Sequence, residues 1–152
     1  MKKMILSEII ATNASEVGQS WFDFFSIGHI CFGIGVFLFF SLGYSIPKAR
    51  GDTPILSLLA VFILTFIILI AWEVVENTLF LELNLKFGNR TDSPQNILTD
   101  IVLGTIGALG MLLWAYEAFE KGKKHWPYYV FGLIMFVIWL GVFSIFRFLT
   151  LS

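Results

Sequence analysis

Four long runs of apolar residues constrain the fold of this chain more than any other feature. They cover residues 21–44, 54–80, 94–118 and 127–150. Each is at least as long as the roughly 20 residues that a helix needs to cross a hydrocarbon core of about 30 Å. A backbone in hydrocarbon must satisfy its hydrogen bonds internally, so we expect each run to form one transmembrane helix. The sequence therefore predicts an all-α, polytopic membrane protein with four transmembrane helices in a compact bundle.

The composition supports a single membrane domain over residues 1–152. Hydrophobic residues make up 57% of the chain and charged residues 14%, and the formal net charge is −1. Soluble domains are closer to half apolar and a quarter charged. The composition excludes a disordered chain, a nucleic-acid-binding protein and an ordinary water-soluble enzyme. The partner that it predicts is the lipid bilayer.

Local signals predict where the helices begin. Pro54, Pro94 and Pro127 each stand at the start of a run, where the missing N–H of proline costs nothing. Thr53 and Ser93 precede two of these prolines and are expected to be N-caps. Before the first run, apolar residues recur at helical spacing beside glutamates over residues 4–18. This pattern predicts a short amphipathic helix that lies in the membrane interface.

Four crossings place both termini on the same side of the membrane. We name that side, which also holds loop 81–93, as side A. Side B is the opposite side, which holds loops 45–53 and 119–126. The tyrosines lie at the side B ends of the runs, as in an interfacial aromatic belt. Basic residues divide evenly between the sides, but loop 119–126 is densely basic. The positive-inside rule therefore favours a cytoplasmic side B and external or periplasmic termini.

Polar residues of all four runs approach side A. Charged groups inside a membrane span are costly and are often functional. Glu73, Glu76 and Asn77 share one helical face, and Asn96 and Asp100 share another. The complete set of polar residues near side A is Asp23, His29, Glu73, Glu76, Asn77, Asn96, Asp100 and Arg147.

This set contains more acids than bases. The carboxylates are Asp23, Glu73, Glu76 and Asp100, whereas the bases are Arg147 and, when it is protonated, His29. In a low-dielectric site either protons or a metal ion must compensate the excess. We predict His29, Glu73 and Asp100 as ligands of a divalent ion such as zinc, manganese, iron or magnesium. The alternatives are a hydrogen-bonded network of partly protonated acids that fixes the helix register, and a pathway for protons or ions.

Two motifs resemble known membrane proteins. Trp72-Glu73-Val74-Val75-Glu76-Asn77, with the later D-S-x-x-N-x-x-x-D segment from Asp92 to Asp100, is similar to a family of uncharacterised bacterial membrane proteins. More distantly, residues 26–110 resemble the VanZ-like membrane proteins. The positions that carry this resemblance are His29, Glu73, Arg90, Asp100, Gly107 and Ala108. The resemblance implies a shared fold and site, and an association with the cell envelope and glycopeptide resistance.

The functional hypothesis is a small envelope membrane protein with an acidic pocket near side A. The pocket would bind a cation and act on a lipid-linked or head-group substrate. Glu76 would act as acid or base, and Asn96 and Arg147 would orient or neutralise substrate oxygens. The rival hypotheses are an accessory subunit of a larger membrane complex and a protein that translocates protons or ions. The sequence leaves open whether the chain is an enzyme. It also leaves open whether the chain pairs with other membrane subunits or with a second copy.

Overall fold

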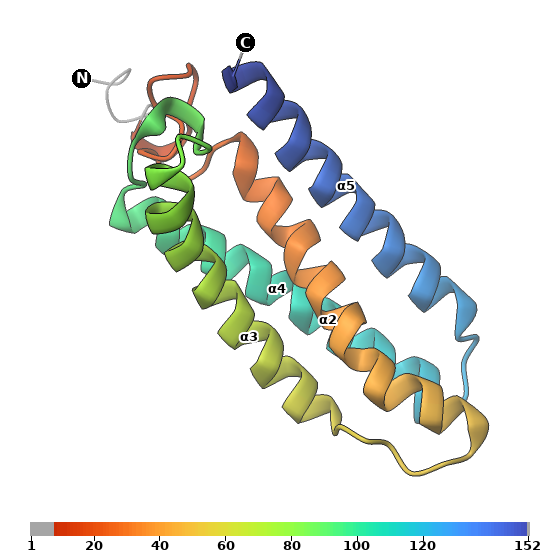
Figure 1. Ribbon diagram of the computed structural model, residues 1–152. Helices are drawn as coiled ribbons and strands as arrows, with labels where there is room; N and C mark the ends of the chain where they lie inside the picture. The colour runs from red at the N-terminus through yellow and green to blue at the C-terminus, as the bar shows by residue number, and fades with distance from the viewer. Residues whose placement is uncertain (1–7, 152) are drawn as a thin grey trace.

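The structure, a computed structural model, describes residues 8–151, and in the last helix it describes side chains as far as residue 145. Four long helices pack together, and all are long and apolar enough to cross a membrane. This confirms the predicted all-α bundle. Their bounds are α2 Phe24–Arg50, α3 Leu58–Val75, α4 Pro94–Phe119 and α5 Trp126–Leu151 (Figure 1). A π-helix, η1 (Glu76–Phe80), continues α3, and a 3-10 turn, η2 (Phe87–Asn89), lies in the next loop.

The start of α4 follows its sequence signal, whereas the start of α3 does not. Ser93 caps α4 by accepting a hydrogen bond from the Asn96 N–H, and Pro94 stands in the first turn. The prediction that Thr53 caps the second span was wrong, because Ser57 is the N-cap of α3. The N–H groups of residues 55 and 56 instead donate to the carbonyl oxygen of Gly43 in α2. These bonds hold the segment against α2 and delay the helix.

Only part of the predicted N-terminal helix over residues 4–18 lies in the described chain. Residues 4–7 lie outside it, and residues 8–9 are helical. Ile10 and Phe22 pair in an isolated β-bridge, and the segment between them contains turns. Side chains explain the turns, because Asn13 accepts a hydrogen bond from the Ser15 N–H and Glu16 accepts one from the Thr12 N–H. Such local bonds compete with the helix ladder. We name residues 10–22 the cap segment.

Helix α2 lies between α3 and α5 and packs closely on α4 (Figure 1). The closeness depends on Gly33, where an added Cβ would collide with the carbonyl oxygen of Gly104 in α4. Small residues permit such backbone approach between membrane helices. Both helices run from side A to side B, so residues one turn before this contact, His29 and Asp100, are brought together near side A. The glycine contact thus positions the site.

Candidate metal centre

Three helices bring His29, Glu73 and Asp100 together in the interior of the bundle. The imidazole Nδ1 lies 3.3 Å from Glu73 Oε1, and Nε2 lies 3.5 Å from Asp100 Oδ2. The three residues are 7%, 4% and 3% exposed, and one ligand atom from each lies within 4.8 Å of the others. We call them the buried triad. The sequence predicted these three residues as metal ligands, and the structure brings them together as a group that could hold a metal ion.

The carboxylates of the buried triad lack the hydrogen bonds that buried oxygens normally receive. Both Glu73 oxygens and Asp100 Oδ1 accept none from the part of the chain that the structure describes. The two contacts with His29 are also longer than an ordinary N–H···O hydrogen bond of about 2.9 Å. A buried carboxylate without a partner is strongly unfavourable. A cation between these oxygens would supply the missing interaction.

A π-helix follows directly after Glu73 and shapes the wall of the site. Helix α3 ends at Val75, and the wider π-turn of η1 begins at Glu76. Asn77 fixes this turn, because its Nδ2 donates to the Glu73 carbonyl oxygen at 3.0 Å and its Oδ1 accepts from the Asp92 N–H at 2.8 Å. Short π-helical segments are frequent at functional sites. Here the turn joins the buried triad to the loop before α4.

Lys86 is a buried cation that the sequence reasoning did not assign to the site. Its Nζ contacts Glu76 Oε1 at 3.3 Å and also contacts Asp92 Oδ2, and only 3% of its side chain is exposed. Burial alone would lower the pKa of Lys86, but the attraction of Glu76 and Asp92 outweighs it and raises the pKa above its usual value. Lys86 therefore stays charged. Its position between apolar residues of loop 81–93 is the one sequence signal for burial.

Asn96 and Asp23 hold the backbone at the edge of the site. Asn96 Nδ2 donates to the Ser20 carbonyl oxygen at 3.0 Å and to Asp23 Oδ2 at 3.2 Å. Asp23 also caps α2 by accepting hydrogen bonds from the N–H groups of Phe25 and Ser26. The hydrogen bonds of both residues are thus used within the protein. Asn96 positions the backbone here, and its substrate-orienting role stays a prediction.

The cap segment covers the side A end of the site. Arg90 Nη2 donates to the carbonyl oxygens of Ser15 and Val17 at 2.6 and 2.8 Å. The Ser93 N–H donates to the Gly18 carbonyl oxygen at 2.7 Å. Arg90, which the family resemblance placed in the site, therefore fastens the cap segment to the loop before α4. The side chain of Arg147, the third predicted catalytic residue, lies outside the described residues.

The enclosed space beneath the cap segment is small. A cavity of about 20 Å³ is bordered by His29 and Asp100 on one side and by Glu76, Lys86 and Asp92 on the other. This volume is about what one water molecule or one ion needs. His29 and Asp100 of the buried triad thus share a single polar chamber with Lys86 and its partners Glu76 and Asp92.

Comparison of the chain with protein-family models, with curated proteins and with solved structures finds no match. The resemblance to the VanZ-like proteins stays a prediction that rests on the motifs quoted above. The functional interpretation depends on the geometry of the polar chamber.

Proposed function

We propose that this chain is an integral membrane protein that holds a divalent metal ion at the buried triad near side A. The observation that carries the proposal is the set of unpartnered oxygens on Glu73 and Asp100, which lie beside the imidazole of His29 in the bundle interior. One nitrogen and carboxylate oxygens form a ligand set that suits zinc, manganese, iron or magnesium. The chamber also contains more acids than bases, and this excess likewise requires a positive charge.

The number of protein ligands favours an ion that takes part in chemistry. Structural zinc sites have four protein ligands, whereas catalytic sites keep a position open for water or substrate. The triad supplies three ligand residues, so a fourth position would stay open for water or substrate. When bound, such an ion polarises phosphoryl or carbonyl oxygens and lowers the pKa of bound water.

We further propose that the substrate is the head group of a membrane lipid or a lipid-linked compound. Glu76 borders the same chamber as His29 and Asp100, and it would accept or donate the proton. The ion pair with Lys86 would keep the Glu76 carboxylate in place. Because the chamber holds little more than one water, substrate entry requires the cap segment to move away from the loop before α4.

Elemental analysis of the detergent-purified protein tests metal binding. The parent is compared with a Glu73→Gln/Asp100→Asn double variant. A matched control is Asp52→Asn/Glu82→Gln, which changes the same residue types at exposed loop positions. We expect about one equivalent of a transition metal or magnesium in the parent and the control, and none in the triad variant. Chelation should lower the thermal stability of the parent, and adding the metal back should restore it, even if the triad variant does not fold.

A structural role is the second candidate, and one observation favours it. The two ring nitrogens of His29 face carboxylates from two other helices, so a protonated imidazole would tie α2, α3 and α4 together. Absence of metal from parent and control, with no effect of the chelator, would support this role and contradict the proposed metal centre. Copurification with other membrane proteins would then identify the complex in which such a subunit serves.

A further inference from the structure

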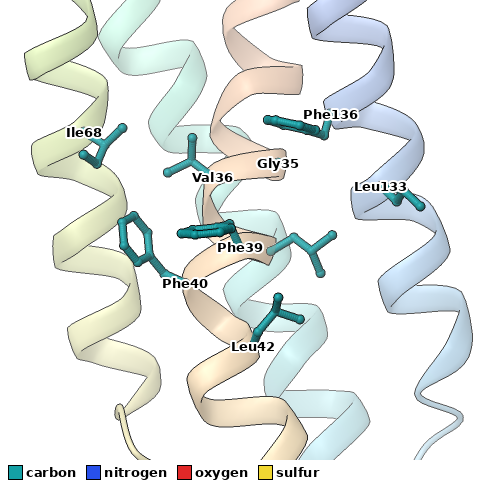
Figure 2. Close-up of a pocket in the computed structure, with 9 residues that line it drawn as sticks. Gly35, Val36, Phe39, Phe40, Leu42, Ile68, Leu133 and Phe136 are labelled. Atoms are coloured by element: carbon teal, nitrogen blue, oxygen red, sulfur yellow. The ribbon is translucent and has the colours of Figure 1, made fainter.

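A groove open to the membrane runs along α2 between α3 and α5. It has a volume of about 460 Å³, and its lining is almost entirely apolar. Figure 2 shows Gly35, Val36 and Phe39 of α2 between Ile68 of α3 and Phe136 of α5. The volume falls in the range of about 300–1,000 Å³ that is usual for ligand pockets. In a membrane-spanning bundle, the phase that this groove faces is hydrocarbon.

The groove exists because α3 and α5 are kept apart. Over the described residues the backbones of these helices do not approach each other, and aromatic side chains span the distance near side A. Gly35 forms part of the floor, and a Cβ there would meet the backbone of Phe136. The groove extends along residues 35–42 of α2, which is about 10 Å of helix at 1.5 Å per residue.

The groove is aligned with the metal centre along one face of α2. Gly28, Phe32, Val36 and Phe39 follow one another at helical spacing on this face. Toward side A the same face borders a small cavity that is lined by His29 and Glu76. The groove and the polar site therefore lie one after the other along a single path between α3 and α5.

Three aromatic rings separate the groove from the polar site. Phe32 stacks on Trp139 with ring centroids 4.5 Å apart, and Trp72 lies 5.1 Å from Phe32 and 5.3 Å from Trp139. Trp72 and Trp139 also line the small cavity beside His29 and Glu76. The rings thus line the path where the apolar groove meets the polar site.

We propose that the groove binds one hydrocarbon chain of a lipid from the side A leaflet, and that the head group of this lipid is what the metal centre acts on. The inference rests on the proposed function and names the part of the substrate that the bundle recognises. A lipid in that leaflet has its polar end near side A and its chain toward the membrane centre, which is the direction from Glu76 to Phe39. The groove is confined to residues 35–42 and its lining is almost entirely apolar, which suits a single acyl chain.

Photolabelling in vesicles tests this inference. The protein is reconstituted in phosphatidylcholine that contains phosphatidylglycerol with a diazirine midway along one acyl chain. Labelled residues are then identified by mass spectrometry. We expect labelling of Val36, Phe39 and Ile68 to exceed, several-fold, that of Leu109 and Leu113, which are exposed lipid-facing residues of α4.

Two variants of adjacent residues on α3 make the test specific. Ile68→Trp fills the groove and should reduce the groove label several-fold, whereas Ile67→Trp, at a residue 53% exposed and outside the groove, should leave it unchanged. Even labelling of all lipid-facing residues, or crosslinks between two copies of the chain through the groove, would overturn the inference. Metal content is measured on the same samples. Bound metal without groove labelling contradicts this inference alone. Groove labelling without metal contradicts the proposed function and leaves only the binding of the hydrocarbon chain by the groove.

Discussion

Charged residues lie in opposite environments at the two ends of the bundle. At side B, Glu120 accepts a hydrogen bond from the Tyr44 hydroxyl and pairs with Lys48 at 2.9 Å, and the side chains of Lys48 and Glu120 are 34% and 36% exposed. At side A, Glu73 and Asp100 are almost fully buried, and three of their oxygens lack a hydrogen bond from the described residues. Side B satisfies its charges in contact with water and lipid head groups, whereas side A retains them inside the bundle.

The difference shows which end is adapted to a ligand. A carboxylate at the surface is solvated and contributes little to stability. A carboxylate held in the interior without a partner destabilises the protein unless something else binds to it. Such a cost is expected at a functional site, where the fold elsewhere compensates it. The following substitutions test the contrast, from the largest expected effect to the smallest.

Removing the buried cation of side A should have the largest effect. Lys86→Met leaves Glu76 and Asp92, whose side chains are 18% and 11% exposed, without their ammonium partner, so we expect a loss of about 3 kcal/mol in the free energy of unfolding. Burial opposes the charge of Lys86, but the two carboxylates raise its pKa above the usual value. The stabilisation is therefore present at neutral pH and is lost only as the pH rises through that raised pKa. Unfolding by SDS titration at several pH values measures it.

The matched control is Lys121→Met at side B, which removes an exposed partner of Glu117. We expect no measurable change in the SDS midpoint, because exposed ion pairs contribute little. Equal effects of the two lysine substitutions would contradict the contrast between the two ends.

Adding a methyl group at the contact between α2 and α4 should have the next largest effect. In Gly33→Ala the added methyl would collide with the Gly104 carbonyl oxygen, so the helices must separate. We expect a loss of about 3 kcal/mol. Metal affinity should also fall, because His29 and Asp100 move apart. The control Gly110→Ala adds a methyl with nothing within 4 Å of it and should stabilise α4 by about 0.5–1 kcal/mol. Retained stability in Gly33→Ala would mean that the glycine contact does not set the spacing of the site.

Removing a buried, hydrogen-bonded hydroxyl group near side B should have the smallest effect. Tyr128 is fully buried, and its hydroxyl donates to Ser41 Oγ at 2.6 Å. Tyr128→Phe removes one hydrogen bond, and Ser41 keeps its own bond to the Leu38 carbonyl oxygen. We expect a loss of about 1 kcal/mol in an SDS titration and an unchanged metal content. A fall in metal content would show that the two ends are coupled.

Depth along a span was sufficient to predict the buried triad. His29, Glu73 and Asp100 lie on three separate apolar runs, and helical rise alone places them at a similar distance from side A. The glycines one turn away from His29 and Asp100 were visible in the sequence as well. The helix number and the interior position of these residues follow from the cost of exposing charge to hydrocarbon.

Loop geometry could not be predicted in the same way. Lys86 and Arg90 lie in a segment without periodicity. The apolar neighbours of Lys86 indicate that it is buried, but they do not indicate that it enters the polar chamber or that Arg90 fastens the cap segment. The capping role of Ser57 was missed for a related reason. Its helix starts late because residues 55 and 56 bond to Gly43, a contact between segments that local signals do not reveal.

The π-turn after Val75 has a consequence for how related chains should be aligned. A π-turn closes its hydrogen bonds over five residues in place of four, so it contains one residue more than the α-helical turn that it replaces. A homologue with an unbroken helix here would show a single-residue deletion between its equivalents of Glu73 and Asp92. Each residue of an α-helix turns by about 100°. An unbroken helix without that deletion would turn the counterpart of Phe80 away from those of Phe143 and Trp72, which Phe80 contacts in this chain.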